Sequence, residues 1–298
     1  MNVRQTKVVC IINPTAGTRR DVRRVVEQVL QTSGVDFVFC ETQTAGHAFL
    51  LAQEAVASEA GCVIGIGGDG TLNEVARALV DTGVPLGIIP VGSGNAFARA
   101  LHISTSPRKA CVQLLGADVK RLDVGTVEDE VFLSTAGVGL DAEVAWKYGA
   151  RKGKRRGLIP YMKLTLGAIR QYEPKPLRLI LDDDFELTCC PSILVVANTA
   201  QYGNGVIIAP GANAEDGLLD VRVIEPKSTF SMAIHGWRLF SGSIDQMPGV
   251  KRFQAQKVRV EREMSGYYQF DGEALDGAAE LTFSVKKRAL SVLVPKGQ

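Results

Sequence analysis

The spacing of hydrophobic positions changes near the middle of the chain. In the first part, short continuous apolar runs alternate with segments in which apolar residues recur every three or four positions. A continuous run is typical of a strand buried on both faces of a parallel sheet, and the second spacing gives a helix one buried stripe. The alternation predicts an open α/β sheet. Its strands are expected at 7–12, 35–40, 62–64 and 86–90.

From about Lys120 onwards, alternating and β-branched segments dominate, and short polar turns separate several of them. This pattern predicts a mainly antiparallel β-sandwich with one helix near 228–240. We therefore expect an α/β domain at 1–118, rejoined by about 286–298, and a β-rich domain at 119–285. A cleft between two such domains is the default position of an active site. The expected strands of the second domain are 131–135, 177–181, 193–197, 206–208, 218–224, 258–260 and 281–285.

Composition narrows the class of protein. The chain has 298 residues and a net charge of +2, which argues against nucleic-acid binding through a global basic field. Its six cysteines form no C-x-x-C pair, so we expect reduced thiols rather than disulfides or a zinc site. No signal peptide is visible, and no apolar stretch approaches the roughly 18 residues that span a bilayer. These features predict a cytoplasmic protein, at most peripheral to the inner face of a membrane.

The third apolar run ends in a turn with four glycines in six residues, Gly65 to Gly70, and an amphipathic helix follows. Such a turn offers backbone N–H groups at a helix N-terminus and one carboxylate, Asp69, which are the parts of a polyphosphate site. The same glycines match the dinucleotide fingerprint. We reject that interpretation because two strands precede the turn and no acidic residue lies between Asp81 and Asp118 to bind a ribose. A glycine-rich turn without a ligand is the alternative.

Three further polar loops follow predicted parallel strands. They lie at 13–17, 42–47 and 92–95, and with 67–73 they are rich in Gly, Ser, Thr and Asn. Ligands of open α/β sheets bind beyond the carboxyl ends of the strands, where all four loops are expected. Their composition suits phosphate and ribose.

Acidic clusters stand out in the second half, at Asp123-Val124-Gly125, Asp216-Gly217 and Asp271-Gly272-Glu273. Each is also an ordinary β-turn sequence, because Asp-Gly is a common hairpin signal. An enzyme that phosphorylates a hydroxyl group needs one carboxylate near the nucleophile and others to bind Mg²⁺.

A basic stretch, Arg151 to Arg156, places five cations in six residues. It is either a solvated loop or a patch that docks on anionic lipid headgroups. A helix is expected to start in the segment that follows it, at 160–166.

Taken in order, these motifs resemble those of the diacylglycerol kinase and sphingosine kinase superfamily, in particular its soluble bacterial lipid kinases. The resemblance runs from Asn13 to Glu273, and the glycine-Asp motif alone is shared with NAD kinases and phosphofructokinases. The matching motifs are Asn13-Pro14-x-Ala16-Gly17, Thr42 with Gly46-His47-Ala48, Gly67-Gly68-Asp69-Gly70-Thr71 with Asn73-Glu74-Val75, Pro90-x-Gly92-Ser93-x-Asn95, Asp123-x-Gly125, Ala136-Gly137-x-Gly139-x-Asp141, Tyr202-Gly203-Asn204-Gly205, Asp216-Gly217 and Asp271-Gly272-Glu273.

The resemblance implies an NAD kinase-like α/β domain that binds ATP and a β-sandwich domain that binds the lipid. It implies that Glu273 or Asp271 is the general base, with Asp69 acting through Mg²⁺. A structural Mg²⁺ would be bound by Asp216 with Asn213 and Leu218, and a catalytic Mg²⁺ network by Asp69 and Asp123. The ATP-binding residues would be Asn13, Pro14, Thr15, Ala16, Gly17, Thr42, Gly67, Gly68, Asp69, Gly70, Thr71, Leu72, Asn73 and Ser93.

The resulting hypothesis is an ATP-dependent lipid kinase that converts diacylglycerol to phosphatidic acid at a membrane surface. One departure leaves the acceptor open: Ala96 stands where bacterial diacylglycerol kinases usually have Asp, so a ceramide or sphingoid-base kinase is the alternative. A non-catalytic nucleotide-sensing module is a further alternative, although it would not need the Asp271-Gly272-Glu273 motif. The expected partners are ATP, Mg²⁺ and a lipid, with no nucleic acid, and a homodimer is allowed.

Overall fold

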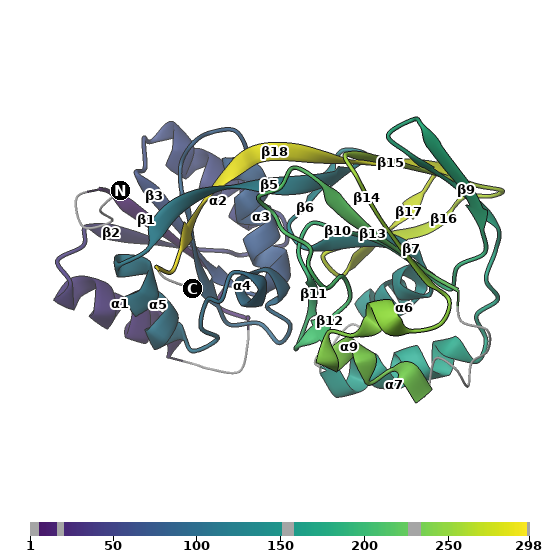
Figure 1. Ribbon diagram of the computed structural model, residues 1–298. Helices are drawn as coiled ribbons and strands as arrows, with labels where there is room; N and C mark the ends of the chain where they lie inside the picture. The colour runs from purple at the N-terminus through teal and green to yellow at the C-terminus, as the bar shows by residue number, and fades with distance from the viewer. Residues whose placement is uncertain (1–5, 17–20, 151–157, 226–233, 297–298) are drawn as a thin grey trace. The chain divides into compact units, whose positions relative to one another are not determined.

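The computed structural model describes residues 6–16, 21–150, 158–225 and 234–296, which form two compact units (Figure 1). Unit 1 comprises Met1–Leu122 and Arg288–Gln298, and unit 2 comprises Asp123–Lys287. Two strands belong partly to unit 1 and partly to unit 2. They are β5 (Asp118–Val127) and β18 (Glu280–Val294). That unit 1 binds the nucleotide and unit 2 binds the lipid stays a prediction.

Unit 1 is built on a parallel sheet. Its strands lie in the order β2-β1-β3-β4, and every neighbouring pair is parallel. The last part of β18 adds a further parallel strand, with Val292 opposite Leu86 on β4. The predicted open α/β sheet is confirmed. Its strands are β1 (Val8–Ile12), β2 (Phe37–Glu41), β3 (Cys62–Gly67) and β4 (Leu86–Pro90).

Helices cover both faces of this sheet. α1 packs on α5, and α2 packs on α3. The predicted stripe of α3 is buried, because Leu72, Val75 and Leu79 all point into the core. The helices are α1 (Val22–Thr32), α2 (His47–Ala57), α3 (Asp69–Leu79), α4 (Ala96–Ala100) and α5 (Pro107–Leu115).

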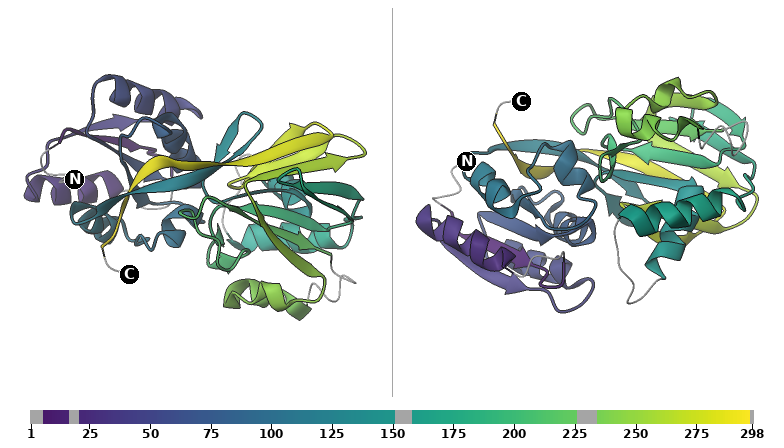
Figure 2. Two further views of the ribbon diagram at one scale, coloured as in Figure 1. Left: turned by 45° about the horizontal axis from the view of Figure 1, so that its top comes forward. Right: turned by 90° about the horizontal axis from the view of Figure 1, so that it is seen from below.

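Unit 2 is a sandwich of two antiparallel sheets, as predicted. One sheet has the order β14-β13-β10-β7-β16-β17, and the other contains β9-β8-β15 and the first part of β18. β5 pairs with β18, and Figure 2 shows the two strands beside each other in both views. The remaining strands of the unit are β6 (Glu130–Phe132), β7 (Thr135–Gly139), β8 (Leu177–Leu181), β9 (Phe185–Cys189), β10 (Ile193–Ala197), β11 (Gln201–Gly203), β12 (Val206–Ile207), β13 (Leu219–Ile224), β14 (Val250–Ala255), β15 (Lys257–Arg262), β16 (Gly266–Phe270) and β17 (Glu273–Gly277).

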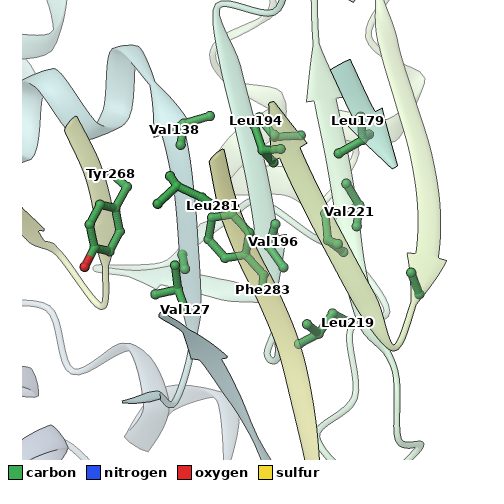
Figure 3. Packing of buried hydrophobic residues seen from close by; sticks show 14 of the residues in the cluster. Val127, Val138, Leu179, Leu194, Val196, Leu219, Val221, Tyr268, Leu281 and Phe283 are labelled. Atoms are coloured by element: carbon green, nitrogen blue, oxygen red, sulfur yellow. The ribbon is translucent and has the colours of Figure 1, made fainter. Parts of the chain in front are cut away.

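The core of unit 2 lies between these two sheets (Figure 3). Leu194 and Val221 point inwards from one sheet, and Leu281 and Phe283 point inwards from the other. Alternation of apolar and polar residues along the strands produces this arrangement, because successive side chains of a strand point to opposite faces.

Unit 2 contains more helix than the sequence pattern predicts. The helix start expected at 160–166 is confirmed by α7 (Leu158–Ile169), but α6 (Leu140–Gly149), which packs on α7, was not expected. The region expected to be helical near 228–240 lies partly outside the described residues, and its described part contains α9 (Arg238–Ser241), followed by a 3₁₀ turn, η2 (Ile244–Gln246). Within the described ranges, no helix is both long and apolar enough to cross a bilayer.

Candidate functional site

The polar loops of unit 1 meet at the carboxyl ends of its parallel strands. Backbone hydrogen bonds tie them to neighbouring strands: Asn13 N donates to Ile66 O at 3.0 Å, and Val91 N donates to Gly67 O at 2.9 Å. Thr42 N donates to Ile12 O at 2.9 Å. The loops predicted to bind ATP therefore lie together at one edge of the sheet.

Two glycine turns at this edge touch each other. A Cβ atom at Gly92 would lie 2.7 Å from the Cα atom of Gly68 and 3.0 Å from Oδ1 of Asn95. The first of these contacts is with backbone, which cannot move aside as a flexible side chain can. Glycine at position 92 therefore allows the loop after β4 to approach the start of α3.

The carboxylate of Asp69 joins the two turns. Its Oδ2 accepts a hydrogen bond from Asn95 N and its Oδ1 accepts one from Ala96 N, both at 2.7 Å. Asn95 has a left-handed backbone, which directs consecutive N–H groups of the loop towards one carboxylate. The two hydrogen bonds hold the negatively charged carboxylate at the start of α3.

The first loop is organised by Asn13. Its Oδ1 accepts hydrogen bonds from Thr15 N at 3.0 Å and Thr15 Oγ1 at 2.8 Å, and its Nδ2 donates to Thr71 Oγ1 at 3.2 Å. Pro14 and Thr15 are exposed in the turn.

The other predicted ATP-binding residues differ in accessibility. Ser93 is exposed, and Thr42 is half-buried. Leu72 and Asn73 are buried, and Leu72 N already donates to Gly68 O at 3.0 Å. Gly17 lies outside the described residues.

A second acidic residue of α3, Glu74, lies one turn further along the helix, and its carboxylate also accepts hydrogen bonds from backbone N–H groups. Its two carboxylate oxygens accept hydrogen bonds from Gly46 N at 2.9 Å and Ala48 N at 3.0 Å. These N–H groups belong to the start of α2, so Glu74 caps that helix from a neighbouring one. Sequence reasoning gave Glu74 no role, because a cap from another helix leaves no local spacing signal.

In unit 2, Asp271 and Gly272 form the two-residue turn between β16 and β17. Both have positive φ angles, 46° and 86°, and Phe270 pairs with Glu273, so this is a type I′ hairpin. Asp271 has a second role. Its carboxylate accepts hydrogen bonds from the backbone N–H groups of Leu133, Ser134 and Thr135 at 2.7, 2.8 and 3.2 Å, while the side chain of Glu273 is exposed.

The loop predicted to bind a structural Mg²⁺ lies between Pro210 and β13. Asp216 Oδ1 accepts a hydrogen bond from Leu218 N at 2.9 Å, and the buried Asp123 accepts one from Gly217 N at 2.7 Å. Burial raises the pKa of Asp216, and the carboxylates of Asp220 and Asp123 raise it further. A loop that gathers negative charge in this way fits a bound cation, which would relieve the repulsion.

The predicted metal ligands do not form one cluster of side chains. Across the residues that the structure describes, no group of three or more His, Cys, Asp or Glu side chains is placed to hold a metal. Asp69 belongs to unit 1 and Asp123 to unit 2, so their shared Mg²⁺ network stays a prediction. The basic stretch Arg151–Arg156 lies outside the described residues.

A cavity of about 280 Å³ in unit 2 lies away from the Asp271 turn. Its lining includes Gly266 and Tyr267, at the opposite end of β16. A strand rises about 3.3 Å per residue, so the cavity begins more than about 10 Å from the turn. We therefore do not assign it to the reacting groups.

One buried acidic residue was missed as a site candidate. Asp141, in the first turn of α6, accepts hydrogen bonds from Tyr202 Oη at 2.9 Å and Gln269 Nε2 at 3.2 Å. Burial raises the pKa of this carboxyl to about 6, although the hydrogen bonds partly oppose the shift. An acidic residue after a glycine-rich strand was a visible signal, but the pattern did not show that α6 buries it.

The comparisons with known proteins cover both units. The family model for the diacylglycerol kinase catalytic domain matches residues 7–127, and that for the YegS C-terminal NAD kinase beta sandwich-like domain matches residues 134–294. A probable lipid kinase YegS-like protein of Pseudomonas aeruginosa is 30% identical over 98% of this chain and 95% of its own. A diacylglycerol kinase of Mycobacterium tuberculosis is 29% identical, covering 97% and 96%.

The fold agrees with these relationships. A crystal structure of a putative diacylglycerol kinase from Bacillus anthracis matches with a TM-score of 0.80 at 24% identity, over 97% of this chain and 95% of that one. A second structure of a putative diacylglycerol kinase from the same organism matches with a TM-score of 0.76 at 25% identity, over 98% of each chain. The predicted family resemblance is confirmed over nearly the whole sequence. The chain belongs to the diacylglycerol kinase family of ATP-dependent lipid kinases.

Proposed function

We propose that the chain transfers the γ-phosphoryl group of ATP to the primary hydroxyl of diacylglycerol, giving phosphatidic acid and ADP. The observation that carries this proposal is the Asp271 turn. Three hydrogen bonds to the Asp271 carboxylate fix a hairpin whose next residue, Glu273, is exposed. A kinase with an alcohol acceptor needs such a carboxylate to accept the hydroxyl proton.

In this scheme Glu273 is the general base and Asp271 positions it. The side chain of Asp271 is engaged with three N–H groups, and a carboxylate stabilised in this way is a poor proton acceptor. Glu273 takes the proton from the lipid hydroxyl, the hydroxyl oxygen bonds to the γ-phosphorus, and the bond between that phosphorus and the bridging oxygen of ADP breaks.

The edge of the unit 1 sheet supplies the nucleotide site. Backbone N–H groups in the first turn of α3 point out of the helix and suit the phosphates of ATP. The Asp69 carboxylate joins the two glycine turns through hydrogen bonds, and its negative charge would attract a cation. Mg²⁺ bound there would neutralise charge on the β- and γ-phosphates.

The structural cation is proposed for the Asp216 loop. Asp216 would supply its carboxylate, and Asn213 and Leu218 would supply oxygen atoms. Because Asp123 N and Ala214 O are joined by a hydrogen bond of 2.7 Å, a cation in this loop would also stabilise the start of unit 2.

Diacylglycerol is favoured over a sphingoid acceptor by the relatives that are named diacylglycerol kinase. Ala96 does not weaken this choice. Its contact with Asp69 is made through the backbone N–H, which any residue except proline would provide, and its side chain is only 7% exposed.

The test is an acceptor panel. The protein is given γ-labelled ATP and Mg²⁺ with mixed micelles that contain diacylglycerol, ceramide or sphingosine. We expect label in phosphatidic acid, and label in that product to form about 10² to 10⁴-fold more slowly when Glu273 is replaced by Gln. Label transferred only to ceramide or sphingosine would support the alternative acceptor, and ATP binding without transfer to any lipid would support a nucleotide-sensing module.

A further inference from the structure

The buried carboxyl of Asp141, in the first turn of α6, has no part in the proposed reaction, yet it contacts the sheet that carries the reacting turn. Asp141 is 7% exposed. A Cβ atom at Gly137 would lie 2.2 Å from the backbone oxygen of Leu194 and 3.3 Å from Asp141 Oδ2, so glycine lets the neighbouring strand approach and places the backbone next to the carboxyl. Gly137 is paired with Gln269 on the neighbouring strand. The carboxyl therefore lies over the sheet, directly beside Gln269.

Gln269 uses both ends of its amide. Its Nε2 donates to Asp141 Oδ2 at 3.2 Å, and its Oε1 accepts a hydrogen bond from Gly272 N at 3.1 Å. The orientation of the amide follows from its partners, because a backbone N–H only donates and an ionised carboxylate only accepts. At 3% exposure, Gln269 has little access to water as a substitute partner.

The turn is thus bound from two directions. The carboxylate of Asp271 binds the N–H groups of residues 133–135, and the amide of Gln269 binds the N–H of Gly272. Gly272 is the residue immediately before Glu273. Its φ of 86° is a conformation that the turn must maintain for Glu273 to begin β17 in register.

We propose that Gln269, anchored by Asp141, is a positioning residue that holds the Gly272 turn and thereby the direction of Glu273. This inference rests on the proposed function, in which Glu273 accepts the hydroxyl proton. A displacement of about 1 Å at a reacting group costs roughly 10²-fold in rate. Loss of the Gln269 bridge should therefore lower turnover without altering the nucleotide site in unit 1.

Several groups face the Asp141 carboxyl. Tyr202 donates to it from β11, and Gln269 donates from β16. Tyr172, in the segment after α7, is close enough for Asp141 and Glu143 to raise its pKa, after the larger effect of burial. Glu143 is itself paired with Lys147 at 3.2 Å. A second carboxyl placed at position 269 would thus meet Asp141 with two tyrosine hydroxyls nearby and would share a proton with it at low pH.

The experiment compares Gln269→Leu and Gln269→Glu with the same changes at Gln254. Gln254 is the control because it lies in the same sheet and its Nε2 also donates to a carboxylate, that of Asp220, at 3.3 Å. Its side chain is exposed, whereas that of Gln269 is buried. We expect Gln269→Leu to lower kcat by about 10²-fold with the KM for ATP unchanged. Gln254→Leu should leave kcat at the wild-type value.

The pH dependence of kcat in Gln269→Glu distinguishes a positioning role from a purely structural one. In this variant the protonated carboxyl at position 269 can donate to Asp141 and restore the bridge, whereas two ionised carboxylates repel each other. The ratio of kcat in Gln269→Glu to wild-type kcat should rise about tenfold or more as the pH is lowered from about 8 to about 6. The corresponding ratio for Gln254→Glu should stay flat. A flat ratio for Gln269→Glu, or an equal rise for Gln254→Glu, would overturn the proposal.

Amide hydrogen exchange at Gly272 separates this proposal from the proposed function, because it needs no substrate. Exchange at Gly272 should accelerate in Gln269→Leu and stay at the wild-type rate in Gln254→Leu. If Gly272 is equally protected in wild type and Gln269→Leu, the positioning role is refuted even where the enzyme phosphorylates diacylglycerol. If exchange responds as expected but no lipid is phosphorylated, the proposed function fails while the hydrogen-bonded bridge stands.

Discussion

Replacement of Asp69 by Asn tests the centre of the nucleotide site with a minimal change in shape. In the wild type both carboxylate oxygens accept backbone N–H groups at 2.7 Å, from Asn95 and Ala96. An asparagine side chain has one acceptor oxygen and one NH₂ group. Whichever way the amide is turned, one backbone N–H loses its acceptor and faces another donor.

The cost follows from these two contacts. A hydrogen bond to a charged group contributes about 1.5 to 3 kcal/mol, and a donor left without a partner costs about 1 to 3 kcal/mol. Because the two terms overlap, we expect Asp69→Asn to lower the free energy of unfolding by about 2 to 4 kcal/mol. Turnover should fall by several orders of magnitude, because loss of the charge also removes electrostatic stabilisation of the transferring phosphoryl group.

Glu74→Gln is the control, since Glu74 lies on the same helix and also accepts two N–H groups. Urea unfolding of both variants should give similar losses of stability, and a labelled-ATP assay should show a much larger loss of turnover for Asp69→Asn. Near wild-type turnover in a folded Asp69→Asn protein would refute the placement of the site. Equal loss of turnover in both variants would assign the effect to general loosening of unit 1.

Three further predictions follow from unit 2. Asp271→Asn should lower the free energy of unfolding by about 1.5 to 3 kcal/mol and should also lower turnover. Glu273→Gln should lower turnover by about 10² to 10⁴-fold and leave urea unfolding unchanged. The reverse pattern would exchange the roles of the two residues. The pKa of Asp141 is raised to about 6 from its ordinary 3.8, so the native state binds the extra proton and stability falls as pH rises through this window. Relative to Asp141→Asn, wild type should therefore lose on the order of 3 kcal/mol between about pH 4 and pH 7 in urea unfolding, and a constant difference would contradict the assignment. Removal of divalent cations with a chelator should lower the Tm of the wild type but not of Asp216→Asn, and equal shifts would exclude a cation at that loop.

Much of the fold could be predicted because its periodic patterns are simple. The continuous run at Val8–Ile12 and the stripe of α3 follow directly from burial on two faces and on one face. α6 was not predicted, because its buried positions surround much of the helix and include an ionisable residue, Asp141. A local pattern cannot indicate that such a residue has partners on other strands.

The candidate site was predictable in parts but not as an arrangement. The Asp-Gly signal at 271–272 indicated a hairpin, and the turn is a hairpin. Its three further contacts come from residues 133–135, more than 130 positions earlier, and no spacing rule reaches that far. The same holds for the bond between Asp141 and Gln269, which are 128 positions apart.

The path of β18 has a consequence for the order in which the protein folds on the ribosome. The strand that pairs with β4 in unit 1 is translated about 200 residues after β4 itself, because all of unit 2 is inserted between them. Until then, the far edge of β4 carries unpaired backbone groups, which are a template for wrong pairing. The half of the protein that is synthesised first therefore cannot complete its sheet until a segment that follows all of unit 2 has been synthesised.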